Sequence, residues 1–172
     1  EKLNDSQQMS KIGSWEWDLQ TNLIWWSDGT FWVYGITPQD FVPNFEANGE
    51  VIHSEDFESY VKAFEYSLQT GEPLDFDVRL VTNEGMLKYC NAKGKVIQDE
   101  FGEPIRFIGT IMDITERKQL TNTITRSRAL LQSVIDTAPA LIYAFDLEQK
   151  LIIANNALAN LLDTHPAAII GK

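Results

Sequence analysis

The chain has 172 residues, of which 44% are hydrophobic and 23% are charged, the composition of a globular protein that can bury a core. Its net charge of −11 repels phosphate backbones and anionic lipid, so neither nucleic-acid binding nor direct membrane contact is expected. The single cysteine excludes an internal disulfide framework and a cysteine-rich metal site, and we expect no metal. No apolar run approaches about 18 residues, so we predict no membrane span.

The acidity is concentrated in the first two thirds of the chain. Residues 1–113 carry 8 basic and 20 acidic side chains, whereas residues 114–172 carry 6 and 5. The sequence begins with Glu1 and stops at Gly171-Lys172, which is typical of a piece cut from a longer protein. We therefore expect one acidic folded body followed by nearly neutral segments.

Two short strands are predicted near the start of the chain. A helical lead-in is expected over residues 1–12, and strands are expected at 14–19 and 23–27. In the first strand tryptophans alternate with acidic residues, so one face is apolar. Asp28 is placed to cap a short helix that ends at Tyr34.

The clearest helix signal covers residues 55–70. Ser54 is a suitable N-cap, and the acidic residues after it complement the helix dipole. Gly71 ends the helix. Apolar residues recur at spacings of four, three and four, which places them on one face: Phe57, Val61, Phe64 and Leu68.

Three further strands are predicted at 74–81, 86–97 and 105–114. They are joined by links of hairpin length, which cannot make parallel crossovers. Five antiparallel strands around a helical middle predict the α+β class.

Residues 115–137 contain neither Gly nor Pro and predict one long helix. Their apolar residues alternate spacings of four and three, the seam of a coiled coil. The seam covers only about two and a half heptads, so an amphipathic helix packed on its own domain is the alternative. The seam consists of Leu120, Ile124, Ser127, Leu131, Val134 and Ala138.

The end of the chain repeats its beginning at an offset of 128 residues. Residues 15–19 (WEWDL) align with 143–147 (YAFDL), and 27–28 align with 155–156. Such a repeat predicts a second copy of the fold that has begun and been cut. A hairpin with one helix leaves its apolar face without a lid, so we expect its ordering to need a partner surface, most simply a second copy of the chain. The face consists of Leu141, Tyr143, Phe145, Leu151, Ile153, Leu158 and Leu161.

Residues 12–118 resemble a PAS domain of the kind that carries a C-terminal PAC segment. Residues 129–172 resemble the opening of a second PAS domain, through APALIYAFD, IIANNAL and the final IIGK. The first resemblance is carried by IGSWEWDL at 12–19, WSDG at 26–29, IHSED at 52–56, TGEPLDFDVRL at 70–80 and GTIMDITERK at 109–118.

The resemblance implies a five-stranded antiparallel sheet in the order 2-1-5-4-3 with helices on one face. Residues 13–114 would form the PAS/PAC domain, 115–137 a coiled-coil-type linker helix, and 138–172 the truncated start of the second domain. The implied function is a non-catalytic sensory or relay module of a multidomain signalling protein, either a histidine kinase or a cyclic-dinucleotide enzyme. Two alternatives stay open, a ligand-free dimerisation or interaction module and a sensor that carries flavin or haem. A homodimer through the linker helix or the PAS surface is expected, and a small-molecule ligand is compatible with the resemblance.

The candidate signal-transmission site lies where the last strand becomes the linker helix. An aspartate at this position can accept backbone hydrogen bonds, and Thr115 is a plausible N-cap for the helix. The same bonds could simply cap the helix, or they could hold it to the sheet so that a shift of the sheet re-aims it. The candidate residues are Asp113, Ile114, Thr115, Glu116 and Arg117.

Aromatic residues are dense enough to line a cavity for a flat cofactor, although they could equally just fill the core. Trp25 and Trp26 point to opposite faces of one strand, so at most one of them faces inward. The candidate lining residues are Trp17, Trp25, Phe31, Phe64, Phe76, Tyr89 and Ile108.

No cofactor is favoured by the residues present. Flavin-binding light sensors of the superfamily use an Asn-Cys-Arg motif on a helix, whereas Cys90 lies mid-strand without that motif, as expected of a buried thiol. Haem-binding relatives need an axial histidine, usually on the long helix, which here contains none; His53 precedes that helix and is expected to set the turn. Asp75 and Asp77 predict an outward charged face rather than a pair of catalytic acids, and no catalytic residue is predicted.

Overall fold

The structure is a computed structural model that describes residues 11–39, 41–82 and 84–171. The predicted helical lead-in at 1–12 lies outside the described residues up to residue 10, and Ile12 already belongs to a strand. The chain divides into two compact units, one that ends at Lys118 and one that begins at Gln119.

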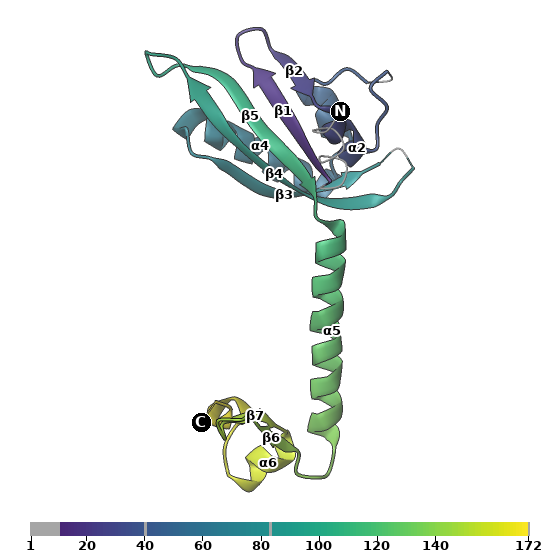
Figure 1. Ribbon diagram of the computed structural model, residues 1–172, viewed down its shortest axis with the longest axis vertical. Coiled ribbons are helices and arrows are strands. Elements are labelled where there is room, and N and C mark those ends of the chain that lie inside the picture. Colours follow the sequence, from purple (N-terminus) through teal and green to yellow (C-terminus); the bar gives the residue numbers. More distant parts are fainter. Residues whose placement is uncertain (1–10, 40, 83, 172) are drawn as a thin grey trace. The chain divides into compact units, whose positions relative to one another are not determined.

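The first unit is built on a five-stranded sheet in the order β2-β1-β5-β4-β3, in which all neighbouring strands are antiparallel (Figure 1). The predicted strand order and the α+β class are confirmed. The predicted strand ends were right to within two residues. The strands are β1 (Ile12–Asp18), β2 (Leu23–Trp26), β3 (Leu74–Val81), β4 (Leu87–Gln98) and β5 (Pro104–Asp113).

Helices α2 (Asp28–Tyr34), α3 (Phe45–Glu50) and α4 (Ser54–Thr70) connect β2 to β3 and cover one face of the sheet (Figure 1). The predicted N-caps were wrong by one residue, because Ser27 caps α2 and His53 caps α4. In both cases the cap is the last residue before the backbone turns helical.

Helix α3 was not predicted, although its cap is visible in the sequence. Asn44 has an extended backbone, and its side-chain oxygen accepts a hydrogen bond of 2.8 Å from the amide of Ala47. This is the geometry of an N-cap that starts a short helix.

The core of the first unit lies between the sheet and its helices and is dominated by aromatic rings. Trp15 sits at its centre, with its ring centroid 5.7 Å from that of Phe64 on α4 and 5.3 Å from that of Phe107 on β5. Trp15 pairs with Gly109, which pairs with Gly94 on the next strand. A Cβ at Gly94 would lie 2.8 Å from the Trp15 ring, and one at Gly109 would come closer still. The two glycines therefore leave the space in which the indole lies against the sheet.

The second unit contains most of helix α5 (Thr115–Thr137), a hairpin of β6 (Tyr143–Phe145) and β7 (Leu151–Ala154), and helices α6 (Asn156–Leu161) and α7 (Pro166–Ile169). Its polar centre is the buried side chain of Asn155, which makes four hydrogen bonds. The Asn155 amide group donates to the carbonyls of Ile135 and Ala140, so this residue joins α5 to the hairpin.

The two hairpins share one hydrogen-bond pattern at the offset of 128 residues. The amide of Ser14 donates to Oγ of Ser27 at 2.9 Å, and the amide of Ile142 donates to Oδ1 of Asn155 at 3.1 Å. Each acceptor also caps the helix that follows it. Ser27 and Asn155 therefore do the same structural work in the two units.

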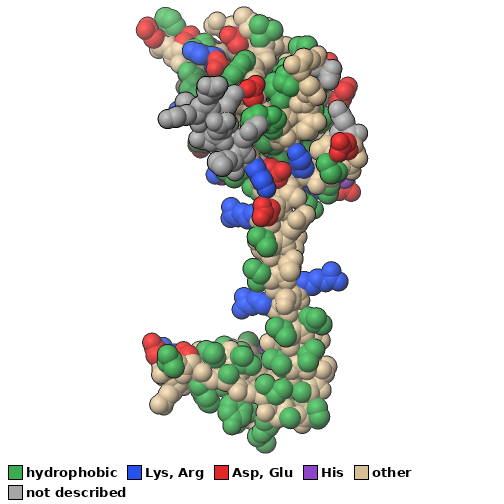
Figure 2. Space-filling model, turned by 45° about the vertical axis from the view of Figure 1, so that its right-hand side comes forward, with side chains coloured by type: hydrophobic (Ala, Val, Ile, Leu, Met, Phe, Trp, Pro, Cys, Tyr) green, Lys and Arg blue, Asp and Glu red, His purple; other side chains and the backbone are tan. Residues whose placement is uncertain are grey.

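Apolar side chains gather on the surface of the second unit (Figure 2). Two members of the face predicted to lack a lid are not exposed, since Leu151 is buried and Leu158 is half-buried. Helix α7 packs on β7, and the amide of Gly171 donates to the carbonyl of Leu151. The exposed members of that face are Leu141, Tyr143, Phe145, Ile153 and Leu161.

We expect Gly109→Ala to lower the free energy of unfolding of the first unit by about 1–3 kcal/mol, because the added methyl group would clash with the backbone carbonyl of Lys93 and with the Trp15 ring. Thr110→Ala, at the exposed next position of the same strand, should change it by less than about 0.5 kcal/mol. Urea titration followed by tryptophan fluorescence measures both. Equal effects of the two substitutions would contradict the proposed role of the glycine.

Candidate functional site

A small cavity of about 30 Å³ lies between the sheet and the helices of the first unit. Trp26 stacks on Tyr34 with ring centroids 4.4 Å apart, and Trp17 stacks on Phe45 at 5.3 Å. These rings occupy the space in which a ligand would otherwise sit. The cavity is lined by Trp15, Trp17, Ile24, Trp26, Tyr34, Phe45, Asn48, Tyr60, Phe64, Val78, Ala92 and Ile111.

Three polar side chains face this aromatic interior. Asn48 is buried, and its Oδ1 atom has no hydrogen-bond partner among the described residues. Burial raises the pKa of Tyr34 and of Tyr60, so both hydroxyls stay protonated. The cavity has room for about one water molecule, which could donate to Asn48.

The interior does not fit a flavin or a haem. Pockets that hold such ligands measure about 300–1,000 Å³, at least about ten times the volume of this cavity. Helix α4 carries no histidine, and burial raises the pKa of the Cys90 thiol to about 12, which keeps it protonated and unreactive. Among the described residues no group of three or more His, Cys, Asp or Glu side chains could hold a metal ion.

The structure divides the predicted pocket residues between the interior and the outward face of the sheet. Trp17 and Phe64 line the cavity, while Phe31 and Phe76 belong to or pack against the surrounding core. Trp25 was wrongly assigned to the interior. It is 59% exposed on the other side of the sheet, because alternate residues of a strand point to opposite faces and Trp26 takes the inward position.

Ile108 and Tyr89 were wrongly assigned for the same reason. Ile108 follows the buried Phe107, and Tyr89 precedes the buried Cys90, so both side chains lie on the outward face. The backbone of Tyr89 instead forms hydrogen bonds with Ile114 and Thr115 at the start of α5.

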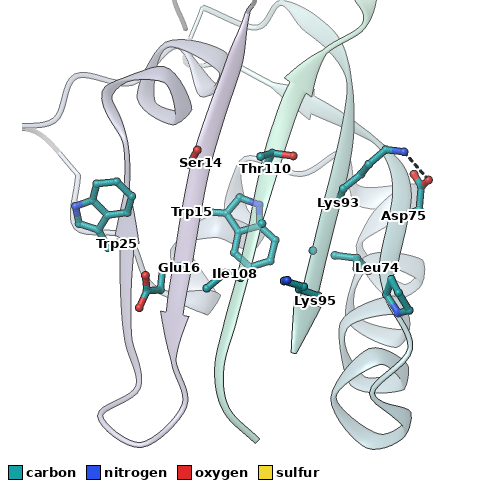
Figure 3. A pocket seen from close by; sticks show the side chains of 13 residues that line it. Ser14, Trp15, Glu16, Trp25, Leu74, Asp75, Lys93, Lys95, Ile108 and Thr110 are labelled. Carbon is teal, nitrogen blue, oxygen red and sulfur yellow. Dashed lines mark hydrogen bonds and ion pairs between the residues drawn. The ribbon is translucent and has the colours of Figure 1, made fainter. Parts of the chain in front are cut away.

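An open groove of about 690 Å³ lies on that outward face of the sheet (Figure 3). Trp25 and Ile108 provide apolar surface, and Lys95 and Glu16 provide charges. Lys93 is already paired with Asp75 at 2.8 Å. The groove is shallow and mixed in character, which suits contact with another surface better than enclosure of a small molecule.

Strand β5 and helix α5 meet at a tightly bonded junction. The β5 strand ends at Asp113, whose Oδ1 accepts the amide of Thr115 at 2.9 Å. The Thr115 hydroxyl in turn accepts the amide of Tyr89 on β4 at 2.9 Å, and the amide of Ile114 donates to the Tyr89 carbonyl at 2.8 Å. Ile114 itself is buried. The start of the helix is therefore bonded to two strands at once.

The prediction of Thr115 as the N-cap was wrong. Thr115 is the first helical residue, and its side chain binds β4 rather than its own helix. Asp113 supplies the side-chain acceptor for the helix start instead. Glu116 is exposed and pairs with Lys11 at 3.0 Å, and Arg117 is exposed.

The side chains of the predicted linker seam are exposed except for Ala138, which is half-buried. Leu120, Ile124, Leu131 and Val134 are 59–62% exposed, and α5 contains no buried residue. Their shared spacing on α5 leaves an apolar stripe available for another helix.

Sequence reasoning missed the ion pairs that tie the helices to β3. Arg79 on β3 binds Asp56 on α4 through two side-chain contacts of 2.9 and 2.6 Å, and its amide also donates to Asp56. A further contact of 2.9 Å joins Arg79 to Glu55. Lys118 on α5 pairs with Asp77 at 2.9 Å. The alternation of charge along β3 was visible in the sequence, but the partners lie 23 or more positions away.

A five-stranded antiparallel sheet, helices on one face and an outgoing helix after the last strand define a class of sensory domain. A family model described as PAS fold matches residues 23–111, slightly more than half of the chain. The chain therefore belongs to the PAS-fold family.

The relatives are signalling proteins. The chain is 27% identical over 155 residues to a probable diguanylate cyclase, DgcE, of Escherichia coli K12, covering 90% of this chain and 14% of that protein. It is 25% identical over 160 residues to the sensor protein FixL of Bradyrhizobium diazoefficiens, covering 93% of this chain and 30% of FixL. The structure of a sensory box histidine kinase/response regulator from Burkholderia thailandensis superposes with a TM-score of 0.62 at 24% identity, over 77% of this chain and 99% of that one.

The chain thus spans less than a third of the length of either of these curated relatives. As a PAS-fold domain it is a sensory signalling module, a kind of domain that is generally not catalytic. None of the helices in the described part of the chain is both long and apolar enough to span a membrane.

We expect stability to depend on Asp56 in a pH-dependent way. The Arg79 hydrogen bonds hold the pKa of Asp56 below its ordinary value, so its contribution is present above about pH 3.9 and is lost as the pH falls through the lower folded-state pKa. Asp56→Asn should cost about 1–2 kcal/mol at pH 7, between exposed and buried ion pairs, and the difference from wild type should shrink below about pH 4.

Urea titrations between about pH 3 and pH 7 measure this difference. Glu58→Gln is the matched control, because its ion pair with Lys62 on the same helix is exposed and contributes little. A difference between wild type and Asp56→Asn that does not change over this range would contradict the assignment.

Proposed function

We propose that this chain is a relay module of a multidomain cytoplasmic signalling protein, either a histidine kinase or a cyclic-dinucleotide enzyme. Residues 13–114 form the input domain, 115–137 the linker helix, and 138–172 the start of a second domain of the same kind. The module itself carries no catalytic step. It passes a change in the packing of the sheet to the direction or register of helix α5.

The observation that carries this proposal is the junction of β5 and α5. Asp113 and Thr115 connect the start of the helix to both β5 and β4 by hydrogen bonds of 2.9 Å. A displacement of these strands must therefore move the helix or break the bonds. Two discrete arrangements that differ by a few kcal/mol would be enough for a switch.

The small interior favours an input from packing or from a partner over one from a flat cofactor. Aromatic rings fill the interior, and only about 30 Å³ remains. Closely packed cores transmit small displacements because they do not deform continuously. A small molecule or a partner at the outward groove is compatible with this proposal.

A second candidate is a dimerisation module that takes no ligand. The exposed apolar stripe of α5 favours it, since Leu120, Ile124, Leu131 and Val134 follow the spacing of a coiled-coil seam. The shared hydrogen bonds of Ser27 and Asn155 support the proposal that the second unit opens another PAS domain. Dimerisation and relay are compatible, because a paired helix can rotate or slide against its partner.

We expect Asp113→Ala to speed amide exchange in the first turn of α5 about fivefold, because the helix start loses a cap worth about 1 kcal/mol. It should also change the output of the full-length protein. Exchange is measured by mass spectrometry of this chain. Asp99→Ala is the control, since Asp99 accepts two backbone amides in the β4–β5 turn, away from α5.

The relay proposal would be wrong if Asp113→Ala left both the exchange of α5 and the full-length output at wild-type values. A change in exchange without a change in output would leave a structural cap and no relay.

We expect this chain to dimerise with increasing concentration and Ile124→Arg to shift it to monomer, because a charge in the seam opposes helix pairing. Asn122→Arg, at an exposed position of the same helix on the side away from the seam, is the matched control. Sedimentation equilibrium measures the masses. A wild-type chain that stays monomeric at all concentrations would overturn the coiled-coil proposal.

A further inference from the structure

A row of polar contacts crosses the outward face of the sheet and ends on helix α5. Lys93 on β4 binds Asp75 on β3 at 2.8 Å. The Asn91 amide group donates to both Asp75 and Asp77, at 2.9 Å each. Asp77 then binds Lys118 of α5 at 2.9 Å. Both oxygens of Asp77 are used, one by β4 and one by the helix.

This row of contacts reaches α5 at the point where the helix leaves the sheet. Lys118 lies one turn into α5, and its amide donates to the carbonyl of Ile114. Lys118 belongs to the same compact unit as β3 and β4. Its contact with Asp77 is therefore an attachment within the PAS unit, additional to the Thr115 junction with β4.

The same strand is fixed at its next outward position to the helix that covers the core. Two residues after Asp77, Arg79 binds Asp56 and Glu55 in the first turn of α4. Strand β3 thus holds α4 through Arg79 and α5 through Asp77. This connection does not pass through β5 or Asp113.

Lys118 places a positive charge near the start of α5, where such a charge is unfavourable unless it is paired. A positive charge near the start of a helix opposes the helix dipole, so an unpaired lysine there would weaken the helix start. Lys118 is instead only 43% exposed and pairs with a carboxylate from another strand. In keeping with this pairing, Lys118 lowers the pKa of Asp77.

We propose that Asp77 and Lys118 are positioning residues that latch the first turn of α5 to β3, and that Arg79 connects this latch to α4. The proposal rests on the relay function and adds to it a second route, from α4 through β3 to α5. A displacement of α4 then reaches the linker helix at Lys118 as well as at Thr115.

The first test is amide exchange in the first turn of α5, measured on this chain. Lys118→Met should speed exchange by about 1.5- to 5-fold, the range expected for loss of a half-exposed ion pair. If Lys118 had no such role, removal of its charge would slow exchange through the helix dipole, so the direction of the change decides between the two. Glu58→Gln, which breaks the exposed Glu58–Lys62 pair on α4, is the control and should leave α5 unchanged.

A charge swap separates the pair from a general loss of stability. Asp77→Lys alone should speed exchange more than Lys118→Met does, because two like charges then face each other. The double variant Asp77→Lys/Lys118→Asp should return exchange toward the wild-type value. Raised salt should speed exchange in wild type and have a smaller effect in Lys118→Met. Failure of the swap to rescue would overturn the latch.

The second test concerns the connection to α4. Arg79→Lys removes the two-pronged contact with Asp56 and should speed exchange in the first turn of α5 while Lys118 is present. In the Lys118→Met background the same substitution should have no added effect at α5. Purely additive effects of the two substitutions would overturn the α4 connection.

These outcomes are distinct from failure of the relay function itself. If Asp113→Ala speeds α5 exchange and Lys118→Met does not, the latch is wrong and the relay stands. If both speed exchange and neither changes the output of the full-length protein, the latch stands and the relay function is wrong.

Discussion

The packing of Trp15 against Gly94 and Gly109 is the constraint on which the rest of the PAS unit depends. The indole fills the centre of the core and contacts both Phe64 on α4 and Phe107 on β5. Glycine, which has no Cβ, is the residue that fits against the indole at these positions of the two neighbouring strands. The interior is therefore filled by the protein's own rings, and helix α4 is in direct packing contact with the strand that leads to the linker.

A filled interior changes what the module can respond to. A sensor with a large pocket responds to occupancy, whereas this unit has a cavity of about 30 Å³, so the relay proposed above takes a displacement of elements as its input. In the proposed relay, two kinds of contact carry a displacement to α5. Core packing reaches it through β5 and Asp113, and surface ion pairs reach it through β3 and Asp77. Both end within the first turn of the helix.

Most of the fold could be predicted from the sequence, because strand alternation and helix periodicity are local and Gly and Pro mark the ends. The strand order could not be derived that way and came only from the family resemblance. The errors at the site concerned which group a side chain contacts in the fold. Thr115 was read as a cap because caps are local, yet its hydroxyl binds Tyr89, 26 positions away. Trp25 was included because aromatic residues are dense there, and strand alternation allowed only one of Trp25 and Trp26 to face inward without deciding which, whereas the structure turns Trp25 outward. Residues that are far apart in the sequence show no regular spacing that would predict their contact in the fold.

The strengths of the contacts at the junction fit a switch better than a fixed joint. The Thr115 and Ile114 bonds involve the backbone of Tyr89 and are partly shielded, so they hold the hinge in place. The ion pairs of Lys118 and Glu116 are about half exposed or more, so solvent screens both of them and each contributes little to stability. A relay needs two states that differ by only a few kcal/mol, since a larger gap would leave one of them unpopulated. In the proposed relay, the partly shielded bonds to Tyr89 keep the start of α5 in place. The exposed ion pairs of Lys118 and Glu116 can break and re-form, so the direction of the helix can change.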